Sequence, residues 1–233
     1  MRYFERQPLD PRIQTLLDAK TSKEWGTLTD NQRKEIVKQL MLSQKSLCAY
    51  CECLISDEER EHHIEHFEER HDTPDKIFDY TNLLLSCEGN KQPTTKPESV
   101  ATAMLRKSNI SCGNGKEKSR HQNIGIDYLL LLNPTDKHTS ALFSYENGAI
   151  HPSKQCTTFL QLQQVDYTIK RLNLHADRLT EAREERINDV NIFLDGLPED
   201  LQKVYIERLL DETQDKLEPY FSTIKDNFGF ILL

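Results

Sequence analysis

Long hydrophobic runs are missing from this sequence, and glycine and tryptophan are scarce, with eight glycines and one tryptophan in 233 residues. A membrane-spanning helix needs about 18–20 apolar residues in a row, and no stretch provides them. The first residues, MRYFERQPLDP, also lack the apolar core of a signal peptide. Hydrophobic residues make up 36% and charged residues 29%, which excludes collagen-like and disordered classes. We therefore expect a cytoplasmic globular protein with no membrane partner.

A disulfide framework is not expected either, although the chain has six cysteines. Thiols stay reduced in the cytoplasm, so unevenly spaced cysteines favour metal ligands or core positions. Cys48 and Cys51 form a CxxC pair, whose spacing lets both thiolates bind one tetrahedral ion. We predict a structural Zn²⁺ site, with buried free thiols as the alternative. Its four ligands are Cys48, Cys51, Cys87 and Cys112, whereas Cys53 and Cys156 are interpreted as buried free thiols.

The net charge of −8 disfavours non-specific binding of nucleic acid by the chain as a whole. Basic residues are in excess in residues 88–121, where seven Lys and Arg face three acidic residues, a net charge of +4. Such a segment is either a contact for a polyanion or a solvated loop. Charge alone favours the loop.

Three regions differ in composition. In residues 1–47, Thr29 and Asp30 precede apolar residues at helical spacing and predict a helix over 31–43. Residues 48–156 are polar and irregular and predict short strands near 64–67, 83–85 and 128–132, with a hairpin turn at Asn147-Gly148. Residues 157–233 predict two or three helices. The expected class is α+β and mainly helical.

Four of the eight histidines lie between His62 and His71. In a strand, His63 and Glu65 share one face and His66 points to the other, but a bend at the strand end brings Glu65 and His66 to either side of a phosphate. A carboxylate-held divalent cation and a neutral imidazole that deprotonates water together hydrolyse phosphodiesters. Two alternatives stay open: a second structural zinc site that uses His63 and His66, and a charged surface.

Four motifs, read in chain order, resemble the HNH endonuclease family of the ββα-metal, or His-Me finger, fold. They are CAYC at 48–51, HIEHF at 63–67, YTNLLLSC at 80–87 and Cys112-Gly113. The resemblance implies a zinc-stapled core between N-terminal helices and a C-terminal helical scaffold. It implies that His66 is the general base, that Asn82 orients it, and that Glu65, with His63 in support, binds a catalytic Mg²⁺ or Mn²⁺.

Two departures from the family pattern concern the catalytic metal. Glu65 replaces the more usual Asp, and residues 88–111 separate Cys87 from Cys112. The remaining ligand therefore stays open between Asn90 and Asn114, with His121 as a remoter candidate. Because the basic segment interrupts the second cysteine pair beside the active site, we expect it to contact a DNA or RNA substrate, tRNA included. The candidate substrate-binding residues are Lys116, Lys118 and Arg120.

A wider resemblance includes residues 44–52 and the later Leu172-Asn173-Leu174, Leu179 and Arg183. These are similar to the PtuB-like HNH proteins of retron and Septu anti-phage systems. The resemblance implies a toxic effector that binds a PtuA-type ATPase through residues 157–233, and through the ATPase a retron reverse transcriptase with its RNA–DNA hybrid. The alternative is a non-catalytic zinc-binding adaptor of an ATPase complex. Overall acidity disfavours a sequence-specific DNA-binding zinc module.

Overall fold

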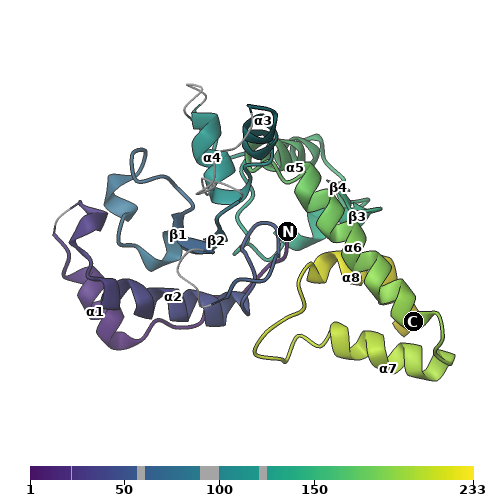
Figure 1. Ribbon diagram of the computed structural model, residues 1–233. Helices are drawn as coiled ribbons and strands as arrows, with labels where there is room; N and C mark the ends of the chain where they lie inside the picture. The colour runs from purple at the N-terminus through teal and green to yellow at the C-terminus, as the bar shows by residue number, and fades with distance from the viewer. Residues whose placement is uncertain (22, 57–60, 90–99, 121–124) are drawn as a thin grey trace.

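The computed structural model describes residues 1–21, 23–56, 61–89, 100–120 and 125–233 (Figure 1). About half of the chain is helical, and the strands form two small antiparallel sheets of two strands each. The α+β class predicted from the sequence is therefore confirmed. Among the described residues, no helix combines the length and the apolar character that crossing a membrane requires.

Two helices open the chain, α1 (Pro11–Asp18) and α2 (Asp30–Gln44). A capping box starts α2, because the Thr29 hydroxyl accepts the Gln32 N–H at 3.3 Å and the Gln32 side chain accepts the Thr29 N–H at 2.9 Å. Lys45 adopts a left-handed conformation with φ 53° and ends the helix. The helix predicted at 31–43 is thus present, with one residue more at each end.

The first sheet pairs β1 (His62–His66) with β2 (Leu83–Cys87) in antiparallel register, so that His63 faces Ser86 and Glu65 faces Leu84. All five residues of β2 are buried. Helix α2 packs against β2, and so does α4 (Cys112–Arg120); the two helices lie on opposite sides of the sheet in Figure 1. A two-stranded sheet is thereby covered on both faces.

The segment before Cys112 contains helix α3 (Val100–Ser108), and α4 begins at Cys112 itself. The sequence predicted only small strands and loops here, because α4 reads CGNGKEKSR and glycine and asparagine are poor helix formers. Tertiary contacts hold its start: the Cys112 N–H donates to the Leu172 carbonyl at 2.7 Å. Gly89 has φ +54°, and an added Cβ would lie 2.1 Å from the Ser111 carbonyl oxygen, so glycine is required there.

Residues 128–132 form turns, and the strand predicted there is wrong. Asp127 causes this, because its backbone carbonyl accepts the N–H groups of Leu130 and Leu131 and its carboxylate accepts that of Leu129. The predicted hairpin is present as β3 (Phe143–Glu146) and β4 (Ala149–Pro152). Asn147 and Gly148 have φ of 46° and 74°, as the tight turn requires.

Four helices follow, rather than two or three: α5 (Phe159–Arg171), α6 (Asp177–Leu194), α7 (Glu199–Leu209) and α8 (Phe221–Phe228). Pro198 is the residue that caps α7. Helices α6 to α8 enclose a small core of their own, which lies apart from the main one. Its buried members are Val190, Leu194, Ile206, Leu209, Ile224 and Phe228.

Glu52, the residue after the CxxC pair, connects distant parts of the chain. Its carboxylate lies 3.3 Å from the Met1 amino nitrogen and accepts the Ser222 N–H at 2.7 Å. Its backbone carbonyl accepts the Tyr220 N–H at 2.8 Å. The start of α8 is therefore held against the cysteine-bearing turn by hydrogen bonds to a buried carboxylate.

The first prediction concerns Gln44, which joins α2 to β2. Its amide nitrogen donates to the carbonyls of Leu47 and Leu85, and its oxygen accepts the Leu85 N–H, all at 2.8 Å. Gln44→Leu keeps the shape but leaves the Leu47 carbonyl and the Leu85 N–H without these partners, whereas the Leu85 carbonyl still accepts the Ala49 N–H at 3.1 Å. We therefore expect urea unfolding to show a loss of about 3 kcal/mol in the free energy of unfolding. The exposed Gln155→Leu is the control, with a change below about 0.5 kcal/mol. Equal stability of the two variants would contradict this role.

Candidate functional site

Four buried thiols come together beside the first sheet. The Sγ atoms of Cys48, Cys51, Cys87 and Cys112 all lie within 4.8 Å of one another, and those of Cys51 and Cys87 are 3.7 Å apart. Tetrahedral zinc with Zn–S bonds of about 2.3 Å requires sulfur atoms about 3.8 Å apart. The four predicted ligands therefore form a cluster that could hold a metal such as zinc.

Three separate elements deliver these thiols. The turn after α2 places Cys48 and Cys51, and it is closed by backbone bonds from the Cys48 N–H to the Cys53 carbonyl and from the Glu52 N–H to the Cys48 carbonyl. Cys87 ends β2 and Cys112 begins α4. The remaining two cysteines, Cys53 and Cys156, lie outside this four-thiol cluster and are partly rather than fully buried.

A pocket of about 340 Å³ opens beside the thiol cluster, between β1, the residues after it and the start of α4. We call it the catalytic pocket, after the role that is proposed for it below. It brings together four residues that the sequence analysis singled out for chemistry, and adds two that have other roles. These six are His63, Glu65, His66 and Asn114, then Glu88 and Lys116.

Lys116 forms a buried ion pair with Glu65. Its ammonium group also donates to the backbone carbonyls of His66 at 2.6 Å and Phe67 at 3.0 Å. Burial by itself raises the pKa of Glu65, but the charges of Lys116 and His63 outweigh it and hold that pKa at about 2. Glu65 is therefore a carboxylate at every physiological pH.

The assignment of Lys116 to an exposed substrate contact needs correction. Lys116 is only 1% exposed, and its charge is used inside the protein to neutralise Glu65. The sequence could not reveal this, because a lysine on a polar helix is normally solvated. The side chains of Lys118 and Arg120, and the whole of Asn90 and His121, lie outside the described residues.

His63 lies between two carboxylates. Its Nε2 is 3.5 Å from Glu65 Oε2, and its Nδ1 is 3.2 Å from Glu88 Oε1. Burial lowers the pKa of His63, but the two carboxylates dominate and raise it to about 9, so the ring is positively charged at neutral pH. Asn114 donates its amide to the Glu88 carbonyl at 2.9 Å. A Cβ on Gly113 would lie 2.7 Å from both His63 Nε2 and Glu65 Oε2, so a larger residue there would displace these side chains.

This donor set suits a hard divalent cation. Mg²⁺ and Mn²⁺ prefer carboxylate and carbonyl oxygen ligands, which Glu65, Glu88 and Asn114 supply. Of the two asparagine candidates from the sequence, Asn114 is the one that lines the catalytic pocket within the described part of the chain.

His66 is held as a neutral imidazole of defined tautomer. Its Nε2 lies 3.0 Å from the Ile77 carbonyl oxygen, and since a carbonyl only accepts, Nε2 carries the proton and Nδ1 carries the lone pair. Burial, the largest influence, lowers the pKa of His66 to about 4. The Trp25 ring packs edge-on against it, with centroids 4.7 Å apart.

Asn82 lies behind the catalytic pocket and braces the loop between β1 and β2. Its amide nitrogen donates to the carbonyls of Glu68 at 2.9 Å and Lys76 at 3.3 Å, and its oxygen accepts the Glu68 N–H at 2.8 Å. This loop carries the Ile77 carbonyl that holds His66. Asn82 is thus connected to His66 through this loop.

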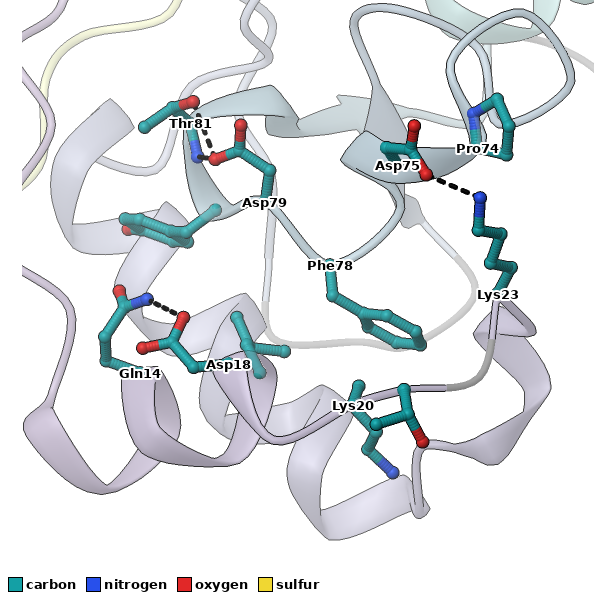
Figure 2. A pocket seen from close by; sticks show the side chains of 12 residues that line it. Gln14, Asp18, Lys20, Lys23, Pro74, Asp75, Phe78, Asp79 and Thr81 are labelled. Carbon is teal, nitrogen blue, oxygen red and sulfur yellow. Dashed lines mark hydrogen bonds and ion pairs between the residues drawn. The ribbon is translucent and has the colours of Figure 1, made fainter.

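The N-terminal segment supports the same loop from the other side. A separate pocket of about 440 Å³ lies between α1 and residues 74–81 (Figure 2). Lys23 forms an ion pair of 2.5 Å with Asp75 at its rim, and the Phe78 ring points into it. Phe78 also stacks on Trp25, with centroids 5.7 Å apart.

Sequence reasoning missed Glu88, Trp25 and the Ile77 carbonyl. Glu88 had a usable signal, because it directly follows the zinc-ligand candidate Cys87, and Trp25 is the single tryptophan of the chain. The Ile77 carbonyl had none, because any residue supplies a backbone oxygen.

Comparisons with known proteins add no family to this description. Neither a scan of protein-family models nor a search of curated proteins finds a match to this chain. The resemblance to HNH endonucleases therefore stays a prediction that rests on the residues named above.

The second prediction tests the thiol cluster. Purified protein should contain about one zinc ion per chain by elemental analysis, and Cys112→Ser should lose it and lower the thermal midpoint by about 10 °C or more, because metal-binding energy in such sites is folding energy. Cys156→Ser, outside the cluster, is the control and should keep both zinc and midpoint. Full zinc content in Cys112→Ser would rule this ligand set out.

The third prediction follows from the pKa of His66. The unfolded histidine titrates near 6.5, whereas the folded one titrates at about 4. Its stabilising contribution is therefore complete above about pH 6.5 and is lost as the pH falls towards 4. Between pH 7 and pH 5, wild type should lose about 2 kcal/mol more unfolding free energy than His66→Gln. In ¹⁵N spectra His66 should be the Nε2–H tautomer at pH 7; a charged ring there would contradict the assignment.

Proposed function

We propose that this chain is a metal-dependent endonuclease of the HNH type that hydrolyses phosphodiester bonds in DNA or RNA. The observation that carries the proposal is His66, whose imidazole is neutral, fixed by the Ile77 carbonyl and placed in one pocket with the Glu65 carboxylate. A general base and an acidic metal ligand at adjacent positions are what metal-assisted hydrolysis requires.

In the proposed reaction, His66 Nδ1 takes a proton from water as the water oxygen attacks the phosphorus, and the bond from phosphorus to the 3′ oxygen breaks. The tautomer set by Ile77 leaves Nδ1 able to accept that proton. A pKa of about 4 describes the pocket without substrate. A phosphate anion bound beside the ring raises the pKa, because it stabilises the imidazolium.

Glu65, with oxygen atoms of Glu88 and Asn114 beside it, would hold the divalent cation. A bound Mg²⁺ or Mn²⁺ supplies Lewis-acid stabilisation of charge on the phosphoryl and leaving oxygens. Lys116 acts as a positioning residue: it contacts the Glu65 carboxylate and the His66 carbonyl at once, so it fixes ligand and base relative to each other. Asn82 positions His66 through the loop that carries Ile77.

The fourth prediction tests the general base. His66→Ala should reduce cleavage of plasmid DNA or total tRNA, assayed with Mg²⁺ or Mn²⁺, by about 100-fold or more, while circular dichroism and zinc content stay as in wild type. His151→Ala, an exposed histidine on β4, is the control and should cleave as wild type does. Undiminished cleavage by His66→Ala would show that another group is the base.

The alternative function is a zinc-binding adaptor of an ATPase complex without catalysis. Large exposed apolar residues at the C-terminal helices favour it, namely Ile192 at 76%, Phe193 at 52% and Phe230 at 67% exposure. Protection against phage, with and without a neighbouring PtuA-type ATPase, distinguishes the two: an adaptor keeps its function in His66→Ala, and a nuclease loses it. Binding of the ATPase, and through it of a reverse transcriptase and RNA–DNA hybrid, remains a proposal from the resemblance.

A further inference from the structure

We propose that a third pocket, between α2 and β1, binds an unpaired nucleotide of the substrate next to the scissile phosphate; this inference rests on the proposed nuclease function. The pocket has a volume of about 760 Å³. We call it the α2 pocket. Its walls combine basic residues from α2 with apolar residues from α2, β1 and the preceding Trp25.

Among the described residues of the lining, the basic ones are Arg33, Lys34 and Lys38, and the acidic one is Asp30. The α2 pocket is therefore positively charged in a chain whose net charge is −8. Lys38 also pairs with Glu35 at 2.6 Å, but both side chains are exposed, and such pairs are weak and easily exchanged. Phosphate oxygens are the ligands that several basic side chains together recognise.

Arg33 gives a second, independent indication. Its Nε is buried and has no hydrogen-bond partner among the described residues. A buried guanidinium nitrogen normally has an acceptor. An anionic ligand in the α2 pocket would supply one, and a phosphate oxygen matches the geometry of a guanidinium well.

The apolar wall of the α2 pocket favours an unpaired base over a base-paired duplex. Val37 and Met41 follow Arg33 at intervals of four residues on α2, and Ile64 faces them from β1. Together with Trp25 they form a concave apolar surface beside the basic residues. An unpaired base offers flat apolar faces to such a surface, whereas a base inside a duplex has both faces stacked.

The position of the α2 pocket relates it to the proposed chemistry. His63 and Ile64 line both this pocket and the catalytic pocket, so the two lie side by side along β1. Trp25 lines the α2 pocket and contacts the His66 ring. A phosphate at His66 therefore leaves the neighbouring nucleotide of the same strand at the α2 pocket. In this proposal the α2 pocket provides the substrate contact that the sequence analysis assigned to Lys116.

The fifth prediction uses Trp25, the single tryptophan of the chain, as a reporter. The full chain with zinc bound and no added Mg²⁺ or Mn²⁺ is titrated with a twelve-residue oligothymidine or with a hairpin duplex of the same length. We expect saturable quenching by oligothymidine and binding of the duplex that is weaker by about tenfold or more. Tighter binding of the duplex, or no saturable quenching, would overturn the proposal.

Charge variants locate the site. In R33Q/K34Q/K38Q, affinity for oligothymidine should fall about tenfold or more, and log K should depend on log salt less steeply by about 2. The matched control, K137Q/K154Q/K203Q, removes three exposed charges elsewhere and should bind as wild type does. Glutamine preserves helix propensity; if the triple variant unfolds, Arg33→Gln alone should lower the slope by about 0.7. Equal affinities of the triple variant and its control for oligothymidine would overturn the proposal that the α2 pocket binds a nucleotide.

Cleavage assays on the same proteins separate the two proposals. If wild type cleaves and R33Q/K34Q/K38Q binds oligothymidine as tightly as wild type, the proposal that the α2 pocket binds a nucleotide is overturned and the nuclease proposal stands. Binding that depends on Arg33, Lys34 and Lys38, without cleavage under any metal condition, supports the pocket and counts against the nuclease.

Discussion

The arrangement of the site depends on the close approach of four thiols, those of Cys48, Cys51, Cys87 and Cys112. The β1–β2 sheet has only five residues in each strand, and an isolated pair of that size is marginally stable. One ion bound by the cluster would fix the turn after α2, the end of β2 and the start of α4 at a single point. Because such binding energy is folding energy, the metal would order the short elements around the catalytic pocket.

Helix α4 connects the thiol cluster to the pocket residues. Its first residue, Cys112, belongs to the thiol cluster, its second, Gly113, allows close approach of β1, and Lys116 reaches Glu65 one turn later. The ion pair between Lys116 and Glu65 is buried, and loss of one partner would leave the other charge uncompensated. The thiol cluster, the Glu65 carboxylate and the His66 backbone carbonyl are therefore coupled through one short helix.

The distribution of charge makes the proposed action on a polyanion compatible with an acidic chain. The acidic side chains Glu65 and Glu88 lie next to cationic Lys116 and His63 inside the catalytic pocket. Positive charge facing solvent next to that pocket comes instead from α2. The net charge of the chain is thus a poor guide to the local potential, because excess acidic residues on other surfaces are screened over about 8 Å at physiological salt.

Features that depend on short-range physics were determined by the sequence itself. Capping at Thr29 and the Asn147-Gly148 turn depend on interactions within a few residues. The CxxC spacing by itself indicates that both cysteines could bind one metal ion. Only the tertiary structure decided the burial of Lys116 and the formation of α4, because contacts with distant residues outweigh local propensity there. It also chose the tautomer of His66, since the partner at Ile77 is a backbone oxygen that every residue carries and that only folding brings into place.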